Sequence, residues 1–349
     1  MREPEVLISA DSHVMESPDL WRENLPRTMR DRAPSYDDLK EKNISAAHAG
    51  GNDPAARVGE MSVDGVSAEV LYPTIAMDQF GIREPAVQEA CFRVYNDWLI
   101  AYCGHAPQRL VGVACISVYD IDRAIAELER CRNAGLRGAL IWQVPPPELS
   151  FASGHYDRFW SAAQDLRMPV SLHILTGAPY GPGVTHALTR RASGLELLHF
   201  AVNTKLLHVT DALLDIIASG VLERFPELKL VLVENEVSWL PFAISQWDKY
   251  CARGGIFSTA TTLLPSEYFK RQVYATFFND APIRWFLQEW GADNCMWSND
   301  FPHPNSTWPK SREVIARDLG HLTGDVRAKV TRRNVAALYA IPVEKLVEA

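Results

Sequence analysis

Short apolar runs rich in β-branched residues alternate along this chain with longer stretches whose apolar residues recur at helical spacing. The short runs have the length of strands, and the longer stretches have the period of about 3.6 residues that helices require. Such alternation is typical of a parallel sheet whose strands are joined by crossover helices. The pattern predicts strands at 6–10, 68–72, 110–116, 138–142, 170–173, 229–233, 273–277 and 295–298, and helices at 84–103, 121–134, 156–166, 210–224, 267–271 and 323–339.

Eight strands with helices between them predict an α/β protein, a (β/α)₈ TIM barrel, with residues 1–349 forming a single domain. The clearest local unit is the helical stretch at 212–225, which Pro226 ends before the strand that follows. Asp120 and Thr323 stand where helices should begin, and Gly135 stands where one should end. The strand count depends on the boundaries chosen, so an open or seven-stranded sheet is the alternative.

Two connections are too long for simple loops between a strand and a helix. One covers about 14–61, after the first strand, and the other covers about 174–204, after the fifth strand. Both are rich in turn-forming residues, and long loops after barrel strands build the rim of the active site. We therefore expect two rim insertions; disordered segments or surfaces that face another subunit are the alternative interpretation.

Composition and charge narrow the function classes. The net charge of −8 and the absence of a Lys/Arg block argue against a nucleic-acid partner. No apolar stretch is long enough to span a membrane, and no secretory signal precedes the first strand, so we expect a cytoplasmic location. The six cysteines are scattered without a C-x-x-C pair, which fits small buried side chains in a reducing compartment.

Three predicted strands end in side chains that can bind a metal. The first strand leads into Asp11 and His13, which are two residues apart and therefore point the same way. His173 closes the fifth strand, and Asp300 follows the eighth, with His303 just beyond it. Carboxylate oxygen and imidazole nitrogen suit Zn²⁺, Mn²⁺ or Fe²⁺.

Each of these signals has an ordinary structural explanation. Asp11 and Asp300 can cap the backbone that follows them, and His13 and His173 can be hydrogen-bonded core histidines. Their common position favours the metal interpretation, because a barrel brings the carboxyl ends of all its strands into one cavity. The spacing therefore predicts one metal ion held by Asp11, His13, His173 and Asp300.

Several stretches extend this pattern to a known family. They are Asp-Ser-His-Val-Met-Glu-Ser-Pro at 11–18, Trp-Ser-Asn-Asp-Phe-Pro-His at 297–303, and the segments 61–66, 95–98, 109–112 and 220–226. Through them the chain resembles the amidohydrolase superfamily over nearly its whole length. The similarity is to the amidohydrolase-related branch, which includes the aminocarboxymuconate-semialdehyde, resorcylate and carboxyvanillate decarboxylases.

The resemblance implies a role for each position. It places metal ligands at Asp11, His13, His173 and Asp300, with Asp11 standing where the decarboxylases have His or Glu. Glu234 stands where several relatives have a strand-six histidine used in acid–base work, so it is a candidate acid, ligand or partner of an arginine. The fourth strand lacks the lysine that bridges two metals in binuclear relatives, which implies one metal, with Zn²⁺ first and Mn²⁺ or Fe²⁺ as alternatives.

The resemblance favours non-oxidative decarboxylation of a small aromatic or unsaturated carboxylate, with Asp300, Glu234 and His303 in catalytic roles. Hydrolysis of an amide, ester or lactone by metal-activated water is the alternative. A hydratase or an inactive binding barrel ranks below both. Relatives suggest a homodimer with a small-molecule substrate. Aromatic residues near the rim are candidates for substrate contact, and they are Trp239, Trp142, Phe278 and Trp308.

Overall fold

The computed structural model describes residues 5–346 apart from 33, 35–47, 182–192 and 254–259. Its sheet contains eight parallel strands that follow one another in chain order. This confirms the predicted (β/α)₈ barrel and excludes the open and seven-stranded alternatives. The strands are β1 (Ile8–His13), β2 (Ala68–Tyr72), β3 (Leu110–Cys115), β4 (Gly138–Ile141), β5 (Val170–His173), β6 (Leu230–Val233), β7 (Val273–Phe277) and β8 (Cys295–Trp297).

The barrel closes between β8 and β1 through backbone just beyond the end of β8. The N–H of Asp300 donates to the carbonyl of Asp11 at 3.1 Å, and the N–H of His13 donates to the carbonyl of Phe301 at 2.6 Å. Every residue of β1 is buried, as parallel strands covered on both faces require. The seam between first and last strands therefore joins two segments that were predicted to carry metal ligands.

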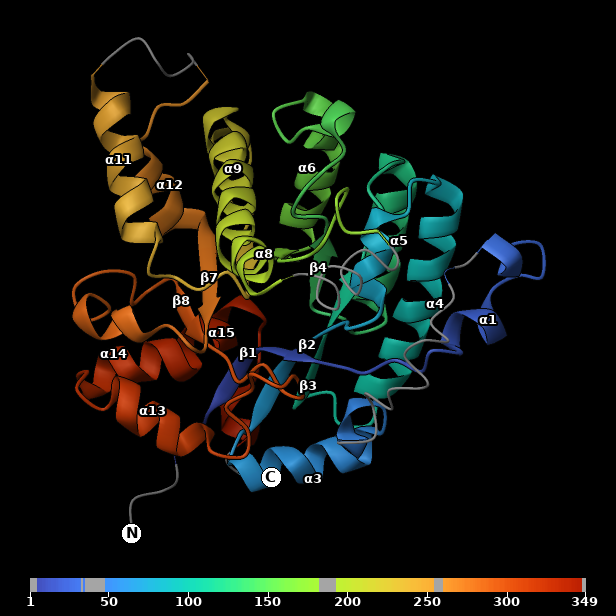
Figure 1. The fold of residues 1–349 in the computed structure, drawn as a ribbon, viewed down its shortest axis with the longest axis horizontal. Coiled ribbons are helices and arrows are strands. Elements are labelled where there is room, and N and C mark those ends of the chain that lie inside the picture. Colours follow the sequence, from blue (N-terminus) through green and yellow to red (C-terminus); the bar gives the residue numbers. More distant parts are fainter. Residues whose placement is uncertain (1–4, 33, 35–47, 182–192, 254–259, 347–349) are drawn as a thin grey trace.

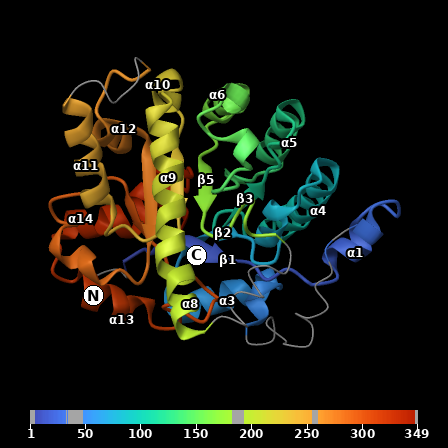
Figure 2. The ribbon, with the colours of Figure 1, turned by 45° about the horizontal axis from the view of Figure 1, so that its top comes forward.

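Helices surround the strands, and α4, α5, α6, α9 and α11 stand side by side around them (Figures 1 and 2). Asp120 caps α5 by accepting from the N–H of Arg123, and Thr323 caps α14 by accepting from the N–H of Val326, as expected. The helices are α1 (Leu20–Asn24), α3 (Pro54–Asp64), α4 (Pro85–Cys103), α5 (Ile121–Asn133), α6 (Asp157–Asp165), α8 (Gly194–Leu198), α9 (Lys205–Ala218), α10 (Val221–Arg224), α11 (Leu240–Ala252), α12 (Pro265–Gln272), α13 (Ser311–Leu319), α14 (Gly324–Ala328) and α15 (Asn334–Leu338).

Five of these helices were not predicted, and α3 changes how the first insertion is understood. It begins at Pro54, with Asp53 accepting from two backbone N–H groups, and it ends at Gly65, whose φ of 74° lies in the left-handed region. The connection after β1 therefore includes a regular crossover helix where the sequence predicted a continuous rim loop. The other four unpredicted helices are α1, α8, α11 and α13.

The second insertion leads into a series of consecutive helical segments. In the described part, α8 runs through a π-helical segment, His199–Thr204, into α9. Figure 2 shows α8 and α9 in line along the front of the barrel. The predicted helix at 210–224 is therefore longer at its start and is divided near Gly220, where α10 begins. Among the described residues, no helix combines the length and the apolar character that a membrane span requires.

Candidate metal centre

The four predicted ligands meet at the carboxyl ends of their strands. The Nε2 atom of His13 lies 3.5 Å from Oδ1 of Asp11 and 3.6 Å from Oδ1 of Asp300. The Nε2 atom of His173 lies 3.8 Å from the same oxygen of Asp11. Neither histidine nor Asp11 exposes any side-chain surface to solvent. Side chains that are up to 289 positions apart in sequence thus share one small volume inside the barrel mouth.

Glu234 joins this cluster from the end of β6. Its Oε2 atom lies 3.5 Å from Nε2 of His173 and 3.8 Å from Nε2 of His13, and 14% of its side chain is exposed. Glu234, Asp11, His13 and His173 each offer one ligand atom within 4.8 Å of the others. The structure thus brings the strand-six carboxylate into one group with three of the four predicted ligands. Asp300 belongs to a second group of this kind, with His13, Glu234 and His303.

The cluster holds polar atoms that lack a hydrogen-bond partner in the described structure. They are both carboxylate oxygens of Asp11, the Nε2 atoms of His13 and His173, and Oδ2 of Asp300. An unsatisfied buried polar group costs about 1–3 kcal/mol, and more when it is charged. A single divalent cation bound by these oxygen and nitrogen atoms removes that cost, so the donor set fits the metal that the sequence predicts.

Backbone carbonyls fix both histidines in one tautomer. Nδ1 of His13 lies 2.8 Å from the carbonyl oxygen of Pro73, and Nδ1 of His173 lies 3.0 Å from that of Ile174. A carbonyl only accepts, so each Nδ1 carries the proton and each Nε2 turns a lone pair toward the cluster. Metal-binding histidines in proteins are oriented in this way.

His303 touches the cluster through Asp300. Its Nδ1 donates to Oδ1 of Asp300 at 2.8 Å, and its Nε2 lies 3.3 Å from the hydroxyl of Thr74. Its ring also lies over that of His13, with centroids 4.0 Å apart. Burial alone would lower the pKa of His303, but the charge of Asp300 and the hydrogen bond to it raise the pKa to about 9.

Burial and mutual repulsion perturb the acids. Burial raises the pKa of Glu234 to about 7, with the charge of Asp300 adding to the effect. Burial also raises the pKa of Asp11, and burial lowers the pKa of His13 well below its ordinary value. These directions describe the side chains alone, and a cation among them would favour ionised carboxylates. Such shifts are typical of functional sites.

Two cluster residues adopt backbone conformations that non-glycine residues rarely take. The φ angle is 54° at Asp300 and 58° at Glu234, both in the left-handed region. The N–H of Glu234 donates to the hydroxyl of Thr276 at 2.9 Å, and that of Asp300 donates to Asp11 as described above. Surrounding bonds therefore hold both residues in strained conformations, as is common where side chains must be aimed at a ligand.

The family profile described as "Amidohydrolase" matches residues 21–341 of this chain. The chain belongs to the amidohydrolase family. The membership that the sequence predicted is thereby confirmed.

Characterised relatives of this amidohydrolase include decarboxylases. The gamma-resorcylate decarboxylase of Rhizobium radiobacter is 24% identical over 74% of this chain and 78% of its own length. Among solved structures, the 5-carboxyvanillate decarboxylase of Sphingomonas paucimobilis has a TM-score of 0.72, with 21% identity over 96% of this chain and 99% of that one. The dihydroxybenzoic acid decarboxylase of Polaromonas, solved with manganese and 2-nitroresorcinol, has a TM-score of 0.69, with 19% identity over 97% of each chain.

A buried polar network under the amidohydrolase cluster escaped the sequence analysis. Nε of Arg57 donates to Glu69 at 2.6 Å, and Nη1 of Arg57 donates to the carbonyl of His13 at 2.7 Å. The amide of Asn299 donates to Glu69 at 3.0 Å, while its oxygen accepts from the hydroxyl of Ser12 at 2.6 Å. The network ties α3 and β2 to the seam that carries Asp11, His13 and Asp300.

The four aromatic residues proposed for substrate contact differ in their surroundings. The indole N–H of Trp239 donates to the carbonyl of Asn235 at 3.1 Å, and that of Trp308 donates to Glu60. Phe278 is 9% exposed. Trp142 is fully buried, and its indole N–H donates to the hydroxyl of Tyr156 at 3.0 Å beside the start of α6. In this structure Trp142 therefore offers no surface to a substrate, whereas the other three side chains lie on segments that follow β6, β7 and β8.

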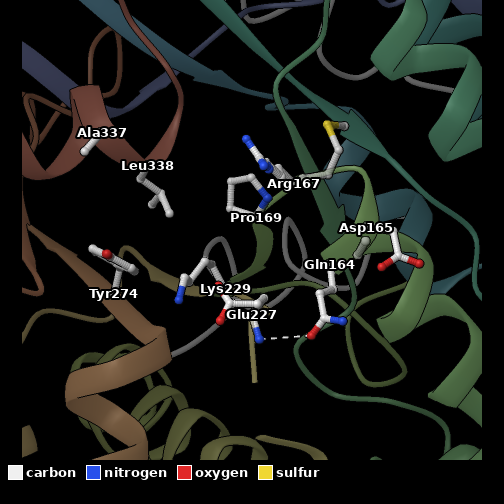
Figure 3. Close-up of a pocket in the computed structure, with 11 residues that line it drawn as sticks. Gln164, Asp165, Arg167, Pro169, Glu227, Lys229, Tyr274, Ala337 and Leu338 are labelled. Atoms are coloured by element: carbon white, nitrogen blue, oxygen red, sulfur yellow. Dashed lines mark hydrogen bonds between the residues drawn. The ribbon is translucent and has the colours of Figure 1, made fainter. Parts of the chain in front are cut away.

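A hollow of about 620 Å³ lies at the other end of the amidohydrolase barrel (Figure 3). Pro169 and Lys229 line it, and each directly precedes a strand, β5 and β6 respectively. The hollow therefore opens at the amino ends of the strands, opposite the cluster. Barrel enzymes carry their chemistry at the carboxyl ends, so we assign the chemistry to the cluster and not to this hollow.

Proposed function

We propose that this amidohydrolase is a mononuclear metal-dependent enzyme that removes carbon dioxide from an aromatic carboxylic acid without oxidation. One observation carries the proposal: in the described structure, five buried oxygen and nitrogen atoms of Asp11, His13, His173 and Asp300 lack a hydrogen-bond partner. These side chains approach one another within 3.5 to 3.8 Å, through His13 to Asp11 and Asp300 and through His173 to Asp11. The relatives described above are decarboxylases of aromatic carboxylic acids, and they supply the substrate class. The proposed substrate is a small molecule, and the proposal includes no nucleic-acid or membrane partner.

Asp11, His13, His173 and Asp300 would hold the ion, and Glu234 belongs to the same cluster, with its Oε2 atom 3.5 Å from Nε2 of His173. When bound, a divalent metal supplies positive charge that polarises substrate oxygens as a Lewis acid. Imidazole and carboxylate donors suit Zn²⁺, Mn²⁺ and Fe²⁺ alike. Zn²⁺ is the first expectation from the sequence, but the manganese in the Polaromonas decarboxylase makes Mn²⁺ our proposal for this chain.

Glu234 is our candidate for the proton donor, because its carboxyl group lies within the cluster and still reaches the mouth with 14% of its surface. Its proton passes to the ring carbon that bears the substrate carboxylate. The bond between that carbon and the carboxylate then breaks, its electron pair returns to the ring, and carbon dioxide leaves. Glu234 regains a proton from solvent through its exposed edge, so atoms and charge balance.

His303 is our candidate for holding the substrate carboxylate. Its hydrogen bond to Asp300 favours the imidazolium form, and 24% of its side chain is exposed. A positive charge at this edge suits an anionic substrate. Trp239, Phe278 and Trp308 are our candidates for the surface that receives the aromatic ring, and we assign to the buried Trp142 only a supporting role. The homodimer and the cytoplasmic location expected from the sequence also belong to this proposal, and light scattering of the purified protein tests the dimer.

Turnover of a substrate panel tests the proposed reaction. The Mn²⁺-loaded protein is incubated with 2,6-dihydroxybenzoate and 5-carboxyvanillate in one set, and with amides, esters and lactones of similar size in another. We expect carbon dioxide and the decarboxylated phenol from a member of the first set. Asp300→Asn should abolish that product, while Asp165→Asn, on an exposed residue beside the hollow in Figure 3, should not. Hydrolysis of the second set without carbon dioxide release would replace decarboxylation by the hydrolase alternative.

A further inference from the structure

Glu16 is a buried acid that lies three residues after His13 and outside the metal cluster. Its side chain is almost fully enclosed, with 1% of the residue exposed. One carboxylate oxygen accepts from the N–H groups of Thr74 at 3.1 Å and Ile75 at 3.0 Å, and the other accepts from Ala76 at 3.2 Å. In the described part of the chain, the groups that stabilise its charge are therefore backbone N–H groups, three from the turn after β2 and that of Glu16 itself.

That turn carries two atoms that contact histidines at the cluster. The carbonyl of Pro73 accepts from Nδ1 of His13 at 2.8 Å. The hydroxyl of Thr74 lies 3.3 Å from Nε2 of His303. The turn after β2 thus points its N–H groups toward Glu16. Pro73 and Thr74 of the same turn point oxygen atoms toward the histidines of the cluster.

We propose that Glu16 is a positioning residue of the metal centre. Its carboxylate fixes the backbone turn at 73–76. This turn then fixes the tautomer and ring orientation of His13 and the orientation of His303. Part of the inference, the effect on metal affinity, rests on the proposed function. The effect on the tautomer of His13 does not, because it concerns the protein without metal.

The physical reason is that backbone N–H groups aimed at one point need an acceptor there. When Glu16 is shortened to alanine, three N–H groups lose their partner at once, and the turn must move to find others. The carbonyl of Pro73 moves with it, so Nδ1 of His13 loses the acceptor that kept its proton. Loss of an outer partner of this kind typically lowers metal affinity by about 10–100-fold.

Two variants and one matched control test this inference. Glu16→Ala removes the acceptor, and Glu16→Gln retains a side-chain oxygen while replacing the other oxygen by an N–H₂ group. The control is Gln272→Ala, because Gln272 is also fully buried and donates to two backbone carbonyls, of Phe225 and Leu228, at the amino end of the barrel. The Gln272→Ala protein loses buried side-chain to backbone hydrogen bonds, as Glu16→Ala does, but far from the cluster.

The readouts are the dissociation constant for Mn²⁺ by calorimetry and the tautomer of His13 by ¹⁵N NMR of metal-free protein, with its signals assigned through their loss in His13→Gln. We expect a dissociation constant about 10–100-fold higher in Glu16→Ala, an intermediate value in Glu16→Gln, and no change in Gln272→Ala. We also expect the Nδ1–H tautomer of His13 to lose its dominance in Glu16→Ala.

A Glu16→Ala protein with the parental dissociation constant and the parental His13 tautomer would overturn the inference. If Glu16→Ala does not fold, Glu16→Gln decides by the same two readouts. If the parental protein binds no Mn²⁺, the proposed function fails, and the tautomer comparison alone decides the role of Glu16.

Discussion

The buried ion pair between Arg57 and Glu69 provides a direct test of how the barrel seam is held. Arg57 is fully enclosed, and Glu69 exposes 1% of its surface. Their closest atoms, Nε and Oε2, are 2.6 Å apart, and the guanidinium also donates to the carbonyl of His13. Arg57→Met keeps much of the side-chain volume but removes the charge and every donor.

The expected cost follows from what the change leaves behind. Glu69 keeps its bond to the amide of Asn299 but becomes a buried carboxylate without a counter-charge. Breaking a buried pair by removing one partner costs about 3–5 kcal/mol. The guanidinium also lies 4.6 Å from the ring centroid of Phe301, and loss of that cation–π contact adds about 0.5–1 kcal/mol. We therefore expect the free energy of unfolding to fall by about 3.5–6 kcal/mol.

Urea unfolding of metal-free protein measures this free energy. The matched control is Arg123→Met, which removes a pair of similar length, 2.6 Å to Glu89, from an exposed surface. Surface pairs contribute about 0–1 kcal/mol, so the control should barely change stability. The double variant Arg57→Met/Glu69→Gln should be more stable than the sum of the single changes predicts, with a coupling of about 2 kcal/mol. An Arg57→Met protein no less stable than Arg123→Met would refute the proposed role of the pair.

Three further outcomes are expected. Glu234→Gln should lower kcat by about 10²–10⁴-fold with unchanged metal content, because the change removes a proton donor. A kcat equal to that of the parental protein under saturating Mn²⁺ would exclude Glu234 as the proton donor. Asp300→Asn should abolish turnover with an unchanged circular dichroism spectrum, and normal turnover would rule out Asp300 as ligand or catalytic group. Mn²⁺ at about 100 times its dissociation constant should raise the free energy of unfolding by about 2.7 kcal/mol in urea titrations, and an unchanged midpoint would argue against a site formed on folding.

The barrel and the meeting of the four candidate ligands could be predicted from the sequence, because both depend on local patterns. Buried parallel strands are short apolar runs, and a polar side chain at the end of such a run falls on one known face of the sheet. Asp11, His13, His173 and Asp300 each follow that rule. Their convergence required no knowledge of distances, only of the topology.

The buried residues that support the cluster could not be predicted from the sequence in the same way. Arg57 lies on α3, inside a segment predicted as a loop, and its partner Glu69 interrupts an apolar strand. Asn299 joins Ser12 and Glu69 across 287 and 230 positions, and no local pattern encodes such a contact. Pro54 and Gly65 were the signals that could have revealed the helix, because proline favours the first turn and glycine the position after the last.

The central claim is that Asp11, His13, His173 and Asp300 hold one divalent metal ion. Elemental analysis of purified protein, dialysed after loading with Mn²⁺, measures this metal content most directly. The variant is His173→Ala, and the control is His155→Ala, because His155 contacts the carbonyl of Val118 away from the cluster. We predict one metal ion per chain in the parental protein and in His155→Ala, and a large loss in His173→Ala. Equal metal content in all three proteins, or none in the parental protein, would contradict the account.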